Sequence, residues 1–180
     1  MKYSHSFQIT LSAVSCALAV LFLYLGTFNP YLLATGYLMG AVFLMIPLSK
    51  NFYLGGFLAY LGTCILTVLL GAIARVWVLL PFITFFGLHP LANALCVKFK
   101  INKLLAFILK DVWFCLTLWL AYHVIFGGVI GSAESSLYQF INQYIFIAIP
   151  LGGTLFFAVY DIIMQRAQVV VNRFVYRIKK

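Results

Sequence analysis

Six apolar stretches of membrane-spanning length dominate this sequence. They run from about residue 7 to 26, 30 to 48, 52 to 73, 76 to 97, 104 to 126 and 137 to 165. A helix needs about 20 mostly apolar residues to cross the hydrocarbon core of a bilayer. We therefore expect an all-α integral membrane protein, built as a bundle of six transmembrane helices.

The composition excludes the main soluble classes of protein. Of the 180 residues, 65% are hydrophobic and 8% are charged, whereas a soluble domain carries about 25% charged residues. So few charges leave a soluble enzyme, a nucleic-acid-binding domain or a disordered chain without the polar surface it needs. The net charge of +9 does not indicate nucleic acid as a partner, because the basic residues form short clusters between apolar runs.

The basic residues also predict the orientation in the membrane. With a cytoplasmic N-terminus, ten basic residues lie on the inner side and only Arg75 lies on the outer side, while Lys110 falls inside the fifth stretch. The inner set is Lys2, Lys50, Lys98, Lys100, Lys103, Arg166, Arg173, Arg177, Lys179 and Lys180. Since cytoplasmic loops are enriched in Lys and Arg, we expect both termini to be cytoplasmic in a multi-pass protein of the cell membrane.

The last fifteen residues predict a basic amphipathic tail. Arg166, Arg173, Arg177 and Lys180 are spaced 7, 4 and 3 residues apart and share one helical face. The other face carries Val170, Val171, Phe174, Val175 and Ile178. We therefore divide the chain into a transmembrane domain, 1–165, and a cytoplasmic tail, 166–180. Such a helix can lie along the anionic lipid of the inner leaflet or dock on a protein partner.

Ionisable residues inside the apolar stretches are functional candidates, because each is costly in a bilayer. Lys110 and Asp161 lie at comparable depths in the fifth and sixth stretches, with Asp111 beside Lys110. We expect Lys110 and Asp161 to form an ion pair, which would fix helix packing or act as a gate or proton relay. Arg75 and Glu134 form a second possible pair near the outer surface.

The sequence contains no recognisable catalytic set. It has no HExxH, GxSxG or Walker motif, and its cysteines lack the spacing of a zinc site. Its three acids, Asp111, Glu134 and Asp161, are too few for most hydrolytic or transferase sites. We expect no enzyme activity, no cofactor and no bound metal, and we expect any transport energy to come from an ion gradient or another subunit.

Two motifs of small residues mark surfaces where helices can approach closely. Ala13 and Ala17 form an AxxxA motif in the first stretch, and Gly36 and Gly40 form a GxxxG motif in the second. Small residues four positions apart make a flat helical surface. Packing inside the protein and docking of a partner remain open for each motif.

The whole pattern resembles the substrate-binding S components of energy-coupling factor (ECF) transporters. The shared features are the length, the six spans, the cytoplasmic termini and the AxxxA motif. Residues 80–94, which contain FFGLHP, resemble the FFGYYP stretch of a less characterised bacterial branch, and Lys98–Lys103 and Lys110 match its continuation. His89 and Asn93 depart from that branch, so no vitamin identity carries over.

The resemblance implies a role in uptake. An S component captures a vitamin or metal from outside and docks on a coupling transmembrane protein that is driven by two ATPase subunits. Only Ala13 and Ala17 match the docking motif of the family. The resemblance therefore implies that this chain is the high-affinity binding subunit for a small solute, such as a vitamin or a related micronutrient.

Capture from outside requires an outward-facing cavity, so the solute-binding residues should come from the outer ends of the helices. The polar and aromatic candidates there are Arg75, Trp77, Tyr122, His123, Glu134, Tyr138 and Asn142. The next candidate region is His89–Asn93, where Pro90 predicts a kink. Two other classes stay open: a six-helix membrane scaffold without transport activity, and a small intramembrane enzyme or gradient-driven transporter.

Overall fold

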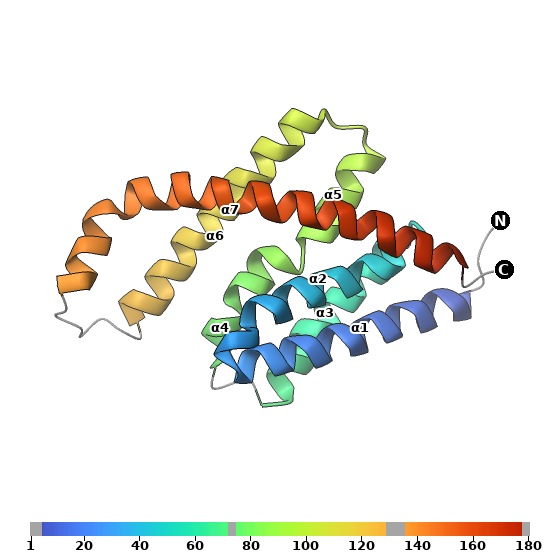
Figure 1. Ribbon diagram of the computed structural model, residues 1–180. Helices are drawn as coiled ribbons and strands as arrows, with labels where there is room; N and C mark the ends of the chain where they lie inside the picture. The colour runs from blue at the N-terminus through green and yellow to red at the C-terminus, as the bar shows by residue number, and fades with distance from the viewer. Residues whose placement is uncertain (1–4, 72–74, 129–135, 178–180) are drawn as a thin grey trace. The chain divides into compact units, whose positions relative to one another are not determined.

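The computed structural model describes residues 5–71, 75–128 and 136–177, and of residues 125–128 and 136–142 it describes the backbone only. These described residues contain helices and no strands (Figure 1). The α-helices are α1 (His5–Phe28), α2 (Leu33–Leu48), α3 (Tyr53–Leu69), α4 (Val76–Pro81), α5 (His89–Lys98), α6 (Lys103–Gly128) and α7 (Ser136–Arg177). A 3₁₀ turn, η1 (Pro30–Leu32), precedes α2, and a π-helical segment, η3 (Phe82–Phe86), follows α4. The predicted all-α class is confirmed.

Five helical segments are long and apolar enough to cross a membrane. They are His5–Phe28, Pro30–Leu48, Val76–Lys98, Lys103–Val124 and Gln143–Arg177. These segments make the chain a multi-pass membrane protein. The remaining predicted span, 52–73, is the 17-residue helix α3, which ends at Leu69 and is followed by Gly71 with a φ of +117°. Glycine at a positive φ terminates helices, so α3 is shorter than its apolar stretch.

The chain divides into two compact units. Unit 1 comprises Met1–Ile101 with Ile163–Lys180, and unit 2 comprises Asn102–Ile162. Helix α7 contributes to both units. Its 42 residues continue through the predicted boundary at 165, so the basic segment up to Arg177 extends the last span as one helix.

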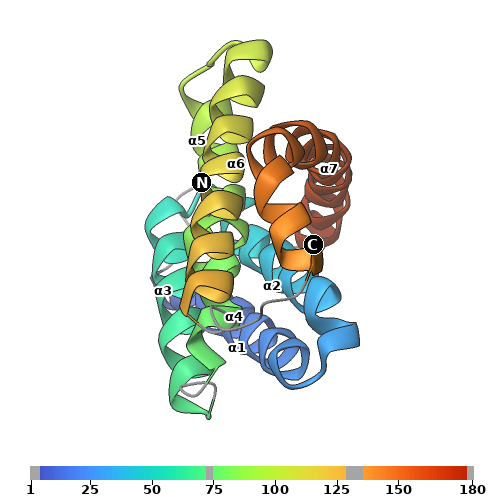
Figure 2. The same ribbon diagram turned by 90° about the vertical axis from the view of Figure 1, so that its left-hand side faces the viewer.

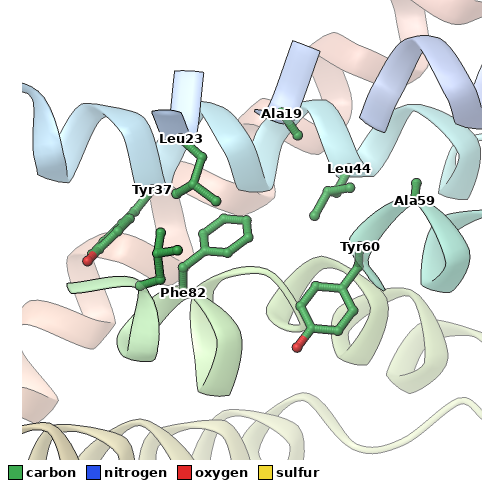
Figure 3. Packing of buried hydrophobic residues seen from close by; sticks show 8 residues of the cluster. Ala19, Leu23, Tyr37, Leu44, Ala59, Tyr60 and Phe82 are labelled. Carbon is green, nitrogen blue, oxygen red and sulfur yellow. The ribbon is translucent and has the colours of Figure 1, made fainter. Parts of the chain in front are cut away.

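Unit 1 is built around a core of aliphatic and aromatic side chains. Helix α1 packs along α2, and both contact α3 (Figure 1 and Figure 2). The core residues are Ala19, Leu23, Tyr37, Leu44, Ala59, Tyr60, Leu79 and Phe82 (Figure 3). Phe82 is fully buried and comes from the π-helical segment. The irregular part of the 76–98 segment therefore supplies the centre of the core.

Glycines bring α1 and α2 together in unit 1. A Cβ atom on Gly36 would lie 2.8 Å from the carbonyl oxygen of Phe22 and 3.0 Å from the Cα atom of Gly26. A Cβ atom on Gly40 would lie 3.0 Å from the ring of Phe82. We call Gly26, Gly36 and Gly40 the glycine seam. The GxxxG motif is thus used for packing inside the protein.

Unit 2 pairs α6 with the part of α7 that precedes Ile163. Phe114 stacks on Phe156 with ring centroids 5.8 Å apart, and Phe157 contacts both Phe107 and Phe114. Helix α7 bends in its N-terminal third (Figure 1), and Pro150 lies inside the helix. Proline removes a backbone hydrogen bond and kinks helices.

Candidate functional site

A groove in unit 1 runs beside the alanine motif. Its volume is about 680 Å³, and it is lined by residues of α1 from His5 to Cys16 and by residues from Asn51 to Ala59 at the start of α3. Its polar lining residues are His5, Gln8, Ser12, Asn51 and Tyr53. Small-molecule sites have comparable volumes of about 300–1,000 Å³. The charge distribution predicts that this end of unit 1 faces the cytoplasm.

The two alanines are exposed next to this groove. Ala13 lines the groove, and both Ala13 and Ala17 are exposed on α1. Ile9 and Leu21, one turn further along in each direction, are 69% and 51% exposed. We call these four residues the alanine stripe. The face of α1 that packs inside unit 1 carries other residues, including Ser15, Ala19 and Leu23.

Small residues also allow α1 and α3, the two helices that line the groove, to pack closely. A Cβ atom on Gly55 of α3 would lie 2.4 Å from the Ser12 hydroxyl oxygen, and one on Gly62 would lie 3.0 Å from the Cys16 sulfur. The α3 backbone therefore lies close to side chains of α1 at these two positions. The helix that carries the alanine stripe, α1, is thus packed closely against α3.

Arg75 and Trp77 are the predicted solute-binding residues in unit 1. The Arg75 side chain donates a hydrogen bond of 3.3 Å to the carbonyl oxygen of Thr27, and its guanidinium carbon lies 5.4 Å from the centroid of the Phe28 ring. Thr27 and Phe28 end α1, where a cation is stabilised by the helix dipole. Trp77 is half-buried on α4. The predicted partner of Arg75, Glu134, lies outside the described residues.

The other predicted solute-binding residues belong to α6 and α7. Tyr122 is half-buried and His123 is exposed. The His123 ring contacts Trp119 edge-on at a centroid distance of 4.3 Å. The side chains of Tyr138 and Asn142 lie outside the described part of the structure. None of the four described candidates lines the groove in unit 1, and a shared outward-facing cavity stays a prediction.

The 76–98 segment is a broken helix rather than a helix kinked at Pro90. Pro90 sits in the first turn of α5, where its missing N–H is tolerated. The irregular backbone lies between Phe82 and Leu88, and the Gly87 N–H donates to the carbonyl oxygen of Phe82, five residues earlier, at 2.8 Å. His89 is fully buried, with its ring 5.3 Å from that of Phe85.

Two tyrosines donate hydrogen bonds to the backbone of the 76–98 segment. The Tyr60 hydroxyl donates to the carbonyl oxygen of Ile83 at 2.6 Å, and the Tyr37 hydroxyl donates to the carbonyl oxygen of Val78. Irregular backbone at membrane depth needs such partners. Neither tyrosine could be identified from the sequence, because the acceptor of Tyr60 lies 23 residues away and that of Tyr37 lies 41 residues away. A tyrosine in the middle of an apolar span nevertheless predicts a hydrogen bond to another part of the chain, since a buried hydroxyl usually finds a partner.

The ion pair predicted in the membrane is confirmed in unit 2. Lys110 Nζ lies 2.5 Å from Asp161 Oδ1, and both side chains are buried. In the same unit, the Thr154 hydroxyl donates a hydrogen bond of 2.9 Å to Oδ2 of Asp111, the residue that follows Lys110. Thr154 could not be identified from the sequence, because a threonine in an apolar span commonly bonds the backbone of its own helix.

Comparison with protein-family models, with curated proteins and with solved structures finds no match to this chain. Within the described residues, no group of three or more His, Cys, Asp or Glu side chains could hold a metal ion. The features of the described residues that could carry a function are the exposed alanine stripe, the groove beside it and the polar groups of unit 2.

Proposed function

We propose that this chain is the substrate-binding S component of an ECF-type transporter in the cell membrane. In this role it captures a small solute, such as a vitamin or a related micronutrient, from outside. It then docks on a coupling transmembrane protein that works with two ATPase subunits. The observation that carries the proposal is the exposure of Ala13 and Ala17 on α1.

The alanine stripe has the properties of a docking face. Its central residues project only a methyl group, so a helix of the coupling protein can come close to the α1 backbone. Its ends, Ile9 and Leu21, are apolar and more than half exposed. The glycine seam has the same spacing of small residues but is buried by packing within unit 1. Of the two motifs, only the alanine motif is free to meet another protein.

The groove beside Ala13 supports the same role. It lies at the end predicted to face the cytoplasm, where a coupling protein with cytoplasmic ATPases has to engage. We assign it to the coupling protein, whose side chains would fill it on docking. The solute site is proposed at the opposite, outer end, among the seven polar and aromatic residues named in the sequence analysis.

The test is purification of the tagged full-length chain from its native host. We expect one coupling membrane protein and two ATPase subunits to copurify, identified by mass spectrometry. Ala13→Trp and Ala17→Trp should lose all three, because an indole ring blocks helix approach. Leu116→Trp is the control, since Leu116 is 61% exposed on a different helix, α6, and it should retain them.

Two results would contradict the proposal. If the unmodified chain copurifies with other membrane proteins but with no ATPase, the scaffold alternative gains support. If Ala13→Trp and Ala17→Trp bind the ATPase subunits as well as Leu116→Trp does, the docking face lies elsewhere.

A further inference from the structure

The positive charge of the chain is gathered in unit 1. Of the twelve Lys and Arg residues, all but Lys103 and Lys110 belong to unit 1, whereas the three acidic residues all belong to unit 2. The cations of unit 1 therefore have no acidic side chain in their own unit to neutralise them. Most of them lie at the end predicted to face the cytoplasm, so this end attracts anions.

Lys98 is the cation that lies at the groove beside the alanine stripe. Its Nζ atom is 4.5 Å from the centroid of the Tyr53 ring, and Tyr53 lines the groove. The same atom is 5.7 Å from the centroid of the Phe99 ring. The faces of aromatic rings attract an ammonium group but do not neutralise it. The charge of Lys98 therefore stays available to an anion.

The polar mouth of the groove coincides with the ends of three apolar helical segments. These segments, each long enough to cross a membrane, begin at His5, end at Leu48 and end at Lys98. His5 lines the groove, and so does Asn51, three residues after Leu48. The ends of membrane-spanning helices lie at the level of the lipid headgroups. Lys98 is therefore placed where phosphate groups of the inner leaflet are expected.

Beyond this mouth, the groove has the length and the lining for a hydrocarbon chain. On α1 the lining runs along one helical face from His5 to Cys16, which is about 16 Å along the helix axis. One leaflet contributes about half of the 30 Å hydrocarbon core, so the two lengths match. Ile9, Leu54 and Leu58 line the groove and are 69%, 72% and 55% exposed, so they offer apolar surface to a lipid.

We propose that this groove binds one anionic phospholipid, with an acyl chain between α1 and α3 and the phosphate group at Lys98. A lysine binds phosphate as a point charge, and basic pockets on the cytoplasmic side of membrane helices bind anionic headgroups. The site belongs to the isolated chain and does not depend on the proposed docking. On docking, side chains of the coupling protein would replace this lipid, so the site is tested on the chain alone.

The test is native mass spectrometry of the full-length chain, delipidated in detergent micelles. The chain is titrated with phosphatidylglycerol or with phosphatidylcholine of the same acyl chains. We expect the affinity for the anionic lipid to be higher by about fivefold or more, the factor that one lysine near an anionic lipid contributes. Equal affinity for the two lipids would overturn the proposal.

Inorganic phosphate distinguishes a lipid site from a simple anion site. Added in excess over the lipid, it should leave phosphatidylglycerol bound, because a free phosphate ion cannot fill the apolar part of the groove. Displacement of the lipid by inorganic phosphate would overturn the assignment to a phospholipid.

A pair of charge variants tests the headgroup end of the site. Lys98→Gln should lower the affinity for phosphatidylglycerol by about fivefold and leave that for phosphatidylcholine unchanged. Arg166→Gln is the control, because it removes the same charge from an exposed position of unit 1 that does not line the groove. If both variants bind phosphatidylglycerol equally well, Lys98 does not hold the phosphate group and the proposal fails.

A pair of volume variants tests the acyl-chain end. Ala13 and Ala17 are both exposed on α1, but only Ala13 lines the groove. Ala13→Trp should therefore weaken the binding of both lipids by about tenfold, whereas Ala17→Trp should bind them like the unmodified chain. The proposed docking requires both variants to lose the ATPase subunits, so the two proposals fail separately. Equal lipid binding by the two variants would overturn the lipid site alone.

Discussion

The two units hold their helices together by different means. Unit 1 relies on close backbone approach at the glycine seam and on a core centred on Phe82. Unit 2 joins α6 to α7 through the buried Lys110–Asp161 pair and the Asp111–Thr154 hydrogen bond, alongside its phenylalanine rings. Lipid tails are as apolar as leucine, so helices in a membrane associate through close packing or polar contacts. The comparison predicts that unit 2 is sensitive to loss of charge and unit 1 to added volume.

The largest effect should come from breaking the ion pair in unit 2. Lys110→Leu or Asp161→Leu alone leaves one buried charge without its partner and should lower the free energy of unfolding by about 3–5 kcal/mol. The double variant removes both charges and should recover most of that loss. Reversible unfolding in mixed detergent micelles measures all three. A double variant as unstable as the single ones would show that the pair itself stabilises unit 2.

An intermediate effect should follow from adding volume to the glycine seam. Gly36→Ala places a methyl group 2.8 Å from the Phe22 carbonyl oxygen, and such overpacking costs about 1–3 kcal/mol of unfolding free energy. Gly152→Ala is the control, because a Cβ atom there meets nothing within 4 Å. The same unfolding assay should show no loss for the control. Equal stability of the two variants would show that α1 and α2 can separate without cost.

A smaller effect is expected at the broken helix of unit 1. Tyr60→Phe removes the donor to the Ile83 carbonyl oxygen. Hydrogen bonds between membrane helices contribute about 0.6 kcal/mol on average and about 1.7 kcal/mol at most, and we expect a loss in that range. Tyr31→Phe, at a side chain that is 95% exposed, should leave the unfolding free energy unchanged. Full stability of Tyr60→Phe would mean that the π-helical segment holds its conformation by packing alone.

The smallest effect on stability should occur at the alanine stripe. Ala17→Trp adds bulk to an exposed face, so the unfolding free energy should change by no more than about 0.5 kcal/mol. Loss of ATPase copurification in this stable variant would separate docking from folding. A strongly destabilised Ala17→Trp would instead mean that this face packs within the protein.

The sequence predicted the features that depend on composition and on rare residues. Long apolar stretches were enough for the helical class, and Lys110 and Asp161 could be paired because so few charges occur within the spans. The two small-residue motifs could not be told apart, because a buried and an exposed motif have the same four-residue spacing. Tyr37, Tyr60 and Thr154 were missed because their partners are brought close only by the fold. The early end of α3 depends on the backbone conformation at Gly71, which apolar periodicity does not reveal.

The length of α7 has a mechanical consequence. Its 42 residues extend over about 63 Å along the helix, roughly twice the thickness of the hydrocarbon core. The helix therefore continues well past the bilayer, and its last turns carry Arg166, Arg173 and Arg177 on exposed positions. The residues from Ile163 onward belong to unit 1, where Val175 is buried and Lys50 Nζ lies 5.6 Å from the centroid of the Tyr176 ring. Because the arginines share one continuous helix with Val175, the packing of Val175 fixes which side of α7 carries their charge.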